Sequence, residues 1–254
     1  MNINQYEKRV FSQNGEDGVI EHIFNNIGLT NKIFVEFGFH MDQNNSRNLI
    51  ENNGFTGLFI DSNIPKNYSN KTVNNIHYHE DWITKNNINQ IISKYYKGNI
   101  DFLSIDVDGI DLYLLDTINV VNPRVICIEY CASIGNELSV TVKYRDNFNR
   151  HKEHPSGFYC NGSLQANINV MKKKGYKFVG SVQGLNAFFV RNDCNLNNLK
   201  ELTCVEGWQP HYGRTYTKAK RWNGEFKKVS IEEQYEWIKD LEWINVDEFG
   251  NILY

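Results

Sequence analysis

Several features that would assign this chain to a common class are missing. No apolar run approaches the roughly 18 residues that a membrane-spanning helix needs, and the first six residues lack a basic region followed by an apolar core. No signal peptide is therefore expected. The five cysteines are odd in number and form no C-x-x-C pair. We therefore expect reduced thiols and a cytoplasmic protein rather than a disulfide framework.

A strong charge excess is also missing. The formal net charge is −3 and the hydrophobic fraction is 41%, which is ordinary for a soluble globular protein and gives no general attraction to nucleic acid or membranes. The 254 residues can bury one substantial core, as a single α/β domain or as one domain with a small appendage.

A glycine-rich phosphate-binding turn is the third absence. A dinucleotide-binding fold needs G-x-G-x-x-G after its first strand, so that the backbone can approach a pyrophosphate. The corresponding turn here, residues 38–46, holds one glycine, Gly38. This turn favours a nucleoside-containing cofactor that carries no phosphate.

Two short apolar runs that end in acids carry most of the remaining information. They are Phe34-Val-Glu-Phe-Gly38 and Leu58-Phe-Ile-Asp61, and a polar turn and a segment that can be helical separate them. In a doubly wound sheet this pattern places Glu36 and Asp61 at the carboxyl ends of neighbouring strands, where ligands bind. A carboxylate after the second strand suits a ribose diol, because it accepts two hydroxyl hydrogen bonds.

The rest of the chain alternates predicted strands and helices. The expected strands span residues 33–37, 57–61, 76–79, 101–107 and 124–130, the expected helices span 15–26, 86–96, 163–175 and 231–241, and 176–182 and 187–191 form a closing antiparallel pair. This alternation predicts an α/β fold of Rossmann-like, doubly wound type with a mostly parallel sheet. We expect one domain over residues 1–200 and a packed C-terminal extension over 201–254. Residues 131–161 are polar and aperiodic, so they predict a functional, lid-like insertion.

S-adenosylmethionine (SAM) meets the cofactor requirement, since it offers a ribose diol, an adenine and an amino-acid end beside a sulfonium, without phosphates. A set of motifs over roughly residues 8–195 also resembles the FkbM-like family of class I SAM-dependent methyltransferases. The motifs are Ser12-Gln-Asn-Gly-Glu-Asp17, Val35-Glu-Phe-Gly38, Leu58-Phe-Ile-Asp61, Phe102-Leu-Ser-Ile-Asp-Val-Asp-Gly109, Ile128-Glu-Tyr130, Gly162-Ser-Leu164, Lys174-Gly-Tyr176 and Asn186-Ala-Phe-Phe-Val-Arg191. This resemblance implies a class I methyltransferase fold over residues 1–200 and O-methylation of sugars or of precursors of surface polysaccharides such as capsule.

The cofactor-binding residues follow from the strand ends and from this resemblance. Asp61 is assigned to the ribose, and Glu36 and Gly38 to the amino-acid end; the alternative for Glu36 is to cap the next helix. The other expected cofactor contacts are Ser12, Gln13, Asp17, Asn45, Ser46, Asp81, Trp82, Thr84 and Asp106. Ser12 has the alternative of an N-cap box, Asn45 and Ser46 that of capping the following helix, and Trp82 that of a core residue.

Three acids, Asp106, Asp108 and Glu129, follow the fourth and fifth strands and would repel one another without a cation. That cation is either the sulfonium or Mg²⁺ or Mn²⁺ held by Asp106 and Glu129. The expected catalytic residues are Asp108, Tyr159 and the base His154, with His151 as an alternative base.

The sequence therefore predicts a SAM-dependent O-methyltransferase for a small acceptor that is anionic or contains a sugar, such as a nucleotide- or phosphate-bearing saccharide precursor. A basic aromatic stretch at 214–228 is expected to recognise the anionic group. Two alternatives stay open. A nucleic-acid methyltransferase draws support from the same stretch but is disfavoured by the overall charge. The other is a non-catalytic binding protein on the same scaffold.

Overall fold

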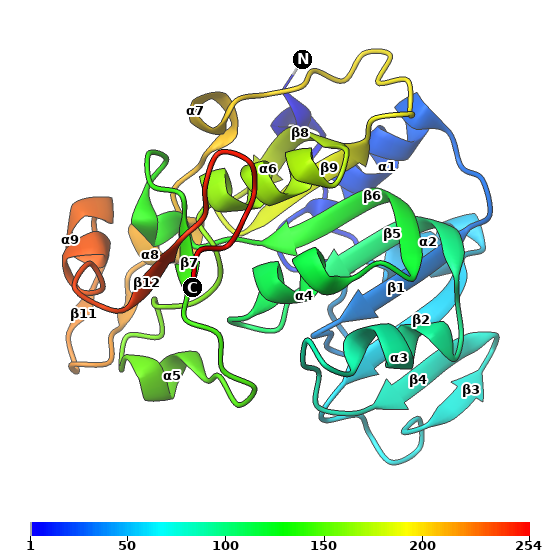
Figure 1. The fold of residues 1–254 in the computed structure, drawn as a ribbon, viewed down its shortest axis with the longest axis horizontal. Helices are drawn as coiled ribbons and strands as arrows, with labels where there is room; N and C mark the ends of the chain where they lie inside the picture. The colour runs from blue at the N-terminus through cyan, green and yellow to red at the C-terminus, as the bar shows by residue number, and fades with distance from the viewer. Residues whose placement is uncertain (1) are drawn as a thin grey trace.

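The computed structural model describes residues 2–254, and its centre is an eight-stranded sheet with the order β3-β4-β2-β1-β5-β6-β9-β8 (Figure 1). The strands are β1 Ile33–Phe37, β2 Thr56–Asp61, β3 Lys71–Val73, β4 Ile76–Glu80, β5 Gly98–Ile105, β6 Val121–Glu129, β8 Tyr176–Val182 and β9 Asn186–Arg191. Neighbours from β4 to β6 pair in parallel, whereas β9 is antiparallel to both β6 and β8. The predicted mostly parallel sheet with its antiparallel closing pair is confirmed.

Helices cover both faces of this sheet and make it doubly wound. The main helices are α1 Glu16–Ile27, α2 Arg47–Asn53, α3 Ile88–Ser93, α4 Asp111–Thr117 and α6 Leu164–Lys173, and a short 3-10 helix, η1 Ile3–Tyr6, precedes them. Successive residues of β1 point to opposite faces, as a strand requires. Phe34 packs with residues of α1 and α2, whereas Val35 and Phe37 pack with residues of α3, α4 and α6. In Figure 1, α3, α4 and α6 lie on the near face.

The bounds of several elements differ from those predicted. The edge strand β3 was not predicted, and β5 and β6 each begin three residues earlier than expected. Both early starts lie where β5 and β6 pair with each other, from Gly98 opposite Val121 onward. The helix predicted over 86–96 is shorter, because after Lys94 the backbone continues as turns that bond to Ile92. Pairing between β5 and β6 therefore sets where these two strands begin.

The insertion (residues 131–161) and the extension (residues 201–254) are joined to each other. The insertion holds η2 Ala132–Ile134, β7 Val140–Val142 and α5 Arg150–Glu153, and the extension holds α7 Cys204–Gly207, α8 Tyr212–Thr215, β10 Ala219–Lys220, β11 Phe226–Lys227, α9 Ile231–Glu236 and β12 Trp243–Asn245. Strands β7 and β12 pair antiparallel, beside α8 and α9 in Figure 1. Ser133 donates to Gln234 at 2.7 Å in the buried contact between η2 and α9. The predicted helix over 231–241 is present but ends at Glu236.

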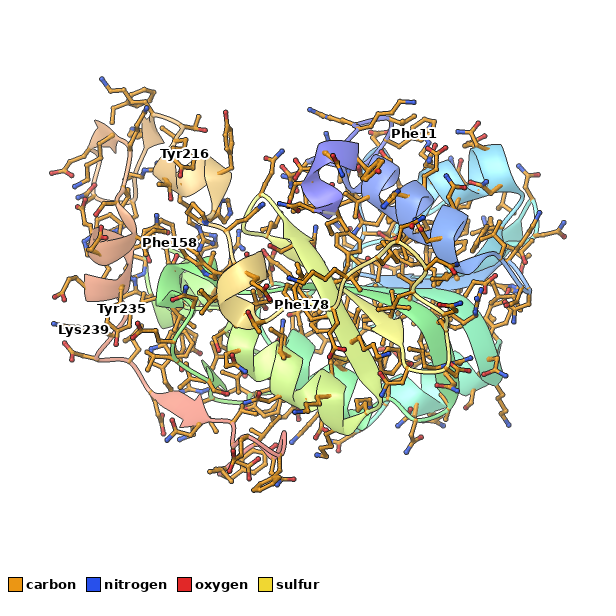
Figure 2. All side chains as sticks on the ribbon, turned by 90° about the horizontal axis from the view of Figure 1, so that it is seen from above. Phe11, Phe158, Phe178, Tyr216, Tyr235 and Lys239 are labelled. Atoms are coloured by element: carbon orange, nitrogen blue, oxygen red, sulfur yellow. The ribbon has the colours of Figure 1, made fainter. Side chains whose placement is uncertain are left out.

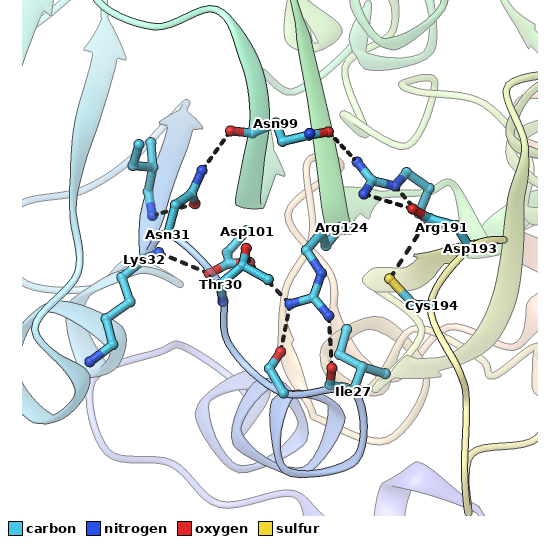
Figure 3. A network of polar contacts seen from close by, with 12 residues as sticks. Ile27, Thr30, Asn31, Lys32, Asn99, Asp101, Arg124, Arg191, Asp193 and Cys194 are labelled. Carbon is cyan, nitrogen blue, oxygen red and sulfur yellow. Dashed lines mark hydrogen bonds and ion pairs between the residues drawn. The ribbon is translucent and has the colours of Figure 1, made fainter.

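At the amino ends of the strands, a polar network ties β5 and β6 to the segment after α1 (Figure 3). Asp101 accepts hydrogen bonds from the backbone and hydroxyl of Thr30, from the backbone of Lys32 and from the guanidinium of Arg124 at 3.1 Å. Arg124 also donates to two carbonyls at the end of α1. Burial alone would raise the pKa of Asp101, but these hydrogen bonds outweigh it and lower that pKa.

Across residues 2–254, no helix combines the length and the apolar character that crossing a bilayer requires.

Candidate functional site

A cavity of about 810 Å³ lies at the carboxyl ends of the parallel strands. Its volume is in the range of small-molecule sites. Its lining comes from the segments after β1, β2, β4, β5 and β6, and from the insertion and the extension. The residues from the strand ends are Gly38, Phe39, His40, Asp61, Ser62, Asp81, Trp82, Ile83, Asp106, Val107, Asp108, Ile110 and Glu129. The others are Gln13, Asn14, Phe148, Asn149, Arg150, His151, Ser156, Gly157, Phe158, Gln183, Leu185, His211, Tyr212, Gly213 and Arg214.

The turn after β1 brings the backbone itself to the cavity. Gly38 has φ +73°, and a Cβ at this position would lie 1.3 Å from the backbone oxygen of Asp106. The backbones after β1 and β5 are therefore so close that only glycine fits between them. Gly38 itself lines the cavity without a side chain, beside Asp61 at the end of the neighbouring strand, and this arrangement suits a ligand that lies across the strand ends.

Asp61, Asp81 and Trp82 line the part of the cavity that lies over β2 and β4. Asp61 is the last residue of β2, is only partly exposed, and has its pKa raised by burial. The backbone of Asp81 donates to the carbonyl of Asp61 at 3.0 Å, which holds the two strand ends together. Trp82 is 51% exposed, so the core alternative for it is wrong. Its indole donates to the carbonyl of Asp146 at 2.5 Å and thereby connects this wall to the insertion.

Of the motif before α1, Gln13 reaches the cavity, whereas Ser12 and Asp17 do not line it. Both of these are fully buried and bonded to each other. One oxygen of Asp17 accepts the backbone N–H groups of Val10, Phe11 and Ser12. Ser12 and Asp17 therefore fix the loop that presents Gln13, and the structure gives them no place against a ligand.

Glu36, Asn45, Ser46 and Thr84 are also absent from the cavity wall. Glu36 alternates along β1 with Val35 and Phe37, so its side chain points under α2 and not off the strand end. It accepts the backbone N–H groups of Asn45 at 2.9 Å and Ser46 at 2.8 Å, which matches the helix-capping alternative. Burial raises its pKa to about 7. Thr84 bonds to Asn87 at the start of α3.

The acid cluster, Asp106, Asp108 and Glu129, lies in the middle of the cavity wall. Their carboxylate oxygens lie within 4.8 Å of one another. Burial, and then the neighbouring Glu129, Asp111 and Asp108, raise the pKa of Asp106 well above its usual value. Burial and then Asp108 raise the pKa of Glu129. All three side chains offer carboxylate oxygens, which are the ligands that Mg²⁺ and Mn²⁺ prefer. The cluster therefore fits a divalent cation, and it equally fits an organic cation or a proton shared between two acids.

The backbone around the acid cluster is held in an unusual conformation. Asp108 has φ +61°, a left-handed conformation that costs a non-glycine residue free energy. Asp111 supports it by accepting the N–H groups of Val107 and Gly109, both at 2.9 Å. The side chain of Asp108 forms an ion pair with Arg150 at 2.5 Å. This turn therefore aims Asp108 at α5 of the insertion.

Two of the expected catalytic residues lie away from the cavity wall. The Tyr159 hydroxyl donates to the carbonyl of Glu242 at 2.5 Å and accepts the N–H of Lys143, so it fastens the extension to the insertion. His154 contacts Ser156 at 2.7 Å and the ring of Trp222, and burial lowers its pKa. His151, its alternative, does line the cavity.

The cavity residues that the sequence analysis missed include Arg150 and His211, and Arg214 was not expected to line the cavity. Arg214 was noted only as part of the basic stretch, because no local spacing links α8 to the end of β6. Burial, followed by Arg214 and then by weaker effects of Arg150 and Arg221, lowers the pKa of His211 to about 3. His211 is therefore neutral at physiological pH.

Two basic side chains of the stretch at 214–228, Arg221 and Lys227, bond to other groups of the protein. The guanidinium of Arg221 donates to three backbone carbonyls, those of Lys227, Arg214 and Thr217. Lys227 pairs with Glu225 at 2.7 Å and with Glu233 at 2.5 Å. Among these side chains only Arg214 lines the cavity. Of the basic side chains of this stretch, Arg214 is therefore the one placed to contact an anion in the cavity.

Comparisons with known proteins add little to this geometry. Neither a protein-family model nor a curated protein sequence matches the chain. One similar solved structure is the N-terminal domain of EvdMO1, crystallised in the presence of SAH and D-fucose. It matches over 69% of this chain and 82% of that chain, with 12% identity and a TM-score of 0.39. A likeness at this level says nothing about function.

Proposed function

We propose that the protein is a SAM-dependent O-methyltransferase that acts on a small polar acceptor of the saccharide type. The observation that supports this most directly is the placement of Gly38 and Asp61. The two lie at the ends of neighbouring parallel strands and face one cavity. An open backbone beside a strand-end carboxylate suits a nucleoside cofactor without phosphates, because the carboxylate can accept both ribose hydroxyls.

The order of the strands gives the cofactor a direction. From β4 to β6 the cavity wall presents first Asp81 and Trp82, then Asp61, then Gly38, and then the acid cluster. Neighbouring strands are about 4.8 Å apart, so Asp61 and Glu129 are separated by three spacings, roughly 14 Å. With the ribose at Asp61, the adenine would lie at Asp81 and Trp82, and the amino-acid end would lie beside Gly38 and Gln13. The acceptor would then lie over the acid cluster.

In such a reaction the protein would align the reactants and accept or orient the proton of the acceptor hydroxyl. Methyl transfer needs the acceptor oxygen, the methyl carbon and the sulfur in line, so most of the rate enhancement comes from positioning. SAM would supply the methyl group and a positive charge. Asp106 and Glu129 face the place where the acceptor hydroxyl would lie, and a carboxylate there can accept its proton or orient it. Asp108, aimed by its left-handed backbone, is the third candidate for that role.

A divalent cation at Asp106 and Glu129 stays a prediction. Asp106 and Glu129 both have raised pKa values and are costly to ionise together without positive charge. Mg²⁺ or Mn²⁺ would allow all three to ionise and would lower the pKa of a bound hydroxyl. Arg150 already compensates Asp108, so a cation would serve chiefly the other two acids.

The finer assignments are part of this proposal. We infer a member of the FkbM-like family, located in the cytoplasm, with one catalytic domain over residues 1–200 and an extension packed on it. The insertion would act as a lid over the acceptor, since α5 of the insertion and α8 of the extension both line the cavity above the acid cluster. A precursor of a surface polysaccharide is the expected acceptor class.

Titration with SAH tests the cofactor assignment. Calorimetry should give a 1:1 complex with wild-type protein, and Asp61→Ala should bind more weakly. A matched control is Asp193→Ala, since Asp193 lies on the surface beside Arg191 and outside the cavity. Absence of SAH binding, or equal affinity for wild type and Asp61→Ala, would contradict the proposal.

A further inference from the structure

The cavity is lined by a buried arginine, Arg214, that forms no ion pair with any acid of residues 2–254. Arg214 is 8% exposed and lines the cavity. Within residues 2–254 its guanidinium donates one hydrogen bond, from Nη1 to the hydroxyl of Ser133 at 2.9 Å, and it takes part in none of the ion pairs. A guanidinium has five N–H donors, and burying its charge without a counter-charge is costly. Its remaining donors are therefore available to a ligand.

Arg214 is also held in a fixed orientation. Its guanidinium lies over the ring of Phe158, 4.3 Å from the ring centre. Figure 2 shows Phe158 between the extension and the sheet, on the same side of the molecule as Tyr216. Phe158 is itself stacked on Trp237 of the extension at 5.6 Å. A guanidinium fixed by stacking presents a planar edge, which is the geometry that binds carboxylate or phosphate oxygens in pairs.

A second arginine faces the same part of the cavity. Arg150 donates to Asp108 and lines the cavity from α5. His211 lies among these arginines and stays neutral, since burial and then Arg214, with a weaker contribution from Arg150, lower its pKa to about 3. The acids that face this group are Asp108, which pairs with Arg150, and Glu129, which accepts from Asn161. Neither acid forms an ion pair with Arg214, although the charge of Arg214 lowers the pKa of Glu129 against the effect of burial.

We propose that Arg214, with Arg150 beside it, forms an anion subsite that binds a carboxylate or phosphate group of the acceptor, so that the acceptor is an acidic sugar or a sugar phosphate. This proposal deepens the proposed function and rests on it for the location of the acceptor. The subsite lies at the β6 side of the acid cluster, whereas Asp61 and Gly38 lie at the other side. Titration of Arg214→Gln with SAH, described below, distinguishes this anion from the carboxylate of the cofactor's amino-acid end.

Three probes with one hexose scaffold test the subsite: D-glucose, D-glucuronate and D-glucose 1-phosphate. Each is titrated into the full chain in the presence and absence of saturating SAH, with binding measured by ligand-observed NMR. At least one of the two anions should bind about tenfold or more tightly than glucose, and raised salt should reduce this preference. A preference for glucuronate identifies a carboxylate subsite, and a preference for glucose 1-phosphate identifies a phosphate subsite.

Variants assign the preference to the arginines. Arg214→Gln should reduce the affinity for the preferred anion about 10- to 100-fold and leave SAH affinity unchanged, as expected when a charged hydrogen-bond donor is lost. Arg214→Lys should keep part of the preference for the anion. Arg150→Gln changes a more exposed residue, and its anion affinity provides a second test if Arg214→Gln does not fold. Lys220→Gln, an exposed cation of the same extension, is the matched control and should change nothing.

The outcomes separate the two proposals. Failure of SAH to bind wild-type protein removes the proposed function, while the titrations without SAH still decide the subsite. Equal affinity for all three probes, no binding of either anion, or a preference that survives both arginine variants would overturn the subsite. A loss of SAH affinity in Arg214→Gln as large as the loss for the anion would also overturn it, because the arginine would then hold the cofactor.

Discussion

Replacing Gly38 with alanine tests the close approach on which the cofactor site depends. The new Cβ would lie 1.3 Å from the backbone oxygen of Asp106 and 2.3 Å from its carbonyl carbon. Both atoms are backbone, so no side chain can rotate away. To restore ordinary contact, the segments after β1 and β5 would have to separate by about 2 Å. That movement would break the hydrogen bond from the Asp106 N–H to the carbonyl of Phe37, now 3.1 Å.

The expected loss of stability has two parts. A non-glycine residue in the left-handed conformation costs about 1–2 kcal/mol, and a buried backbone hydrogen bond left unmade costs about 1–3 kcal/mol. Gly38→Ala should therefore lower the free energy of unfolding by about 2–5 kcal/mol. Gly54→Ala is a matched control, because Gly54 has φ +69° and its added Cβ would meet nothing within 4 Å. The control should lose only the conformational part, about 1–2 kcal/mol.

Urea unfolding of wild type and both variants measures these differences, and calorimetry with SAH shows whether the site is affected. Gly38→Ala should bind SAH more weakly, since the Asp106 carbonyl and the cavity wall must move, whereas Gly54→Ala should bind it normally. If both variants lose the same stability, the backbone approach is not as close as described. If Gly38→Ala is destabilised but keeps its full SAH affinity, the turn after β1 does not contact the cofactor.

Three further predictions concern single groups. Asp61→Asn should weaken SAH binding by about 1–3 kcal/mol at unchanged stability, the cost of losing a charged acceptor, and unchanged affinity in calorimetry would refute the ribose assignment. Mn²⁺ should bind the wild type and fail to bind Asp106→Asn, as electron paramagnetic resonance of free Mn²⁺ would show; no binding by wild type would remove the metal. Burial raises the pKa of Glu36 to about 7, so the folded state retains a proton that the unfolded state releases near pH 4.5. Unfolding free energy should then fall by up to about 3 kcal/mol between pH 4.5 and 7, and Glu36→Gln should flatten this slope in urea unfolding at a series of pH values.

The fold was predictable because its signals are local and periodic. Phe34 and Val35 point to opposite faces of the sheet, and helices cover both faces. A strand buried in this way appears in the sequence as a short, continuous apolar run between turns. The ends of β5 and β6 were predicted less well, because pairing between the two strands extends them. That pairing brings together segments about twenty residues apart, and no local pattern records it.

The candidate site was predictable only where a residue stands at or just beyond the end of a strand. Asp61 ends β2 and Asp106 follows β5, and both line the cavity. Glu36 lies one position inside β1, so its side chain points under α2. A shift of one residue along a strand reverses the face. Arg214 comes from a different part of the chain. Its segment is held at the cavity by contacts between distant segments, such as the hydrogen bond from the Tyr212 N–H to the carbonyl of Gln183 and the bond from Arg214 to Ser133.

The two ends of β5 show why the functional part of this fold lies at one edge of the sheet. Asp101, at the amino end, is fully buried and fully satisfied, so its pKa is lowered and its charge contributes to stability (Figure 3). Asp106, just past the carboxyl end, faces other acids, and its pKa is raised. Nearby, Arg214 is buried and forms no ion pair within residues 2–254. A fold selected for stability alone would pair such groups closely or replace them with apolar residues. Keeping acids with raised pKa values and a buried arginine that forms no ion pair in one cavity costs stability. A ligand that carries a cationic centre and an anionic group would recover that cost when it binds.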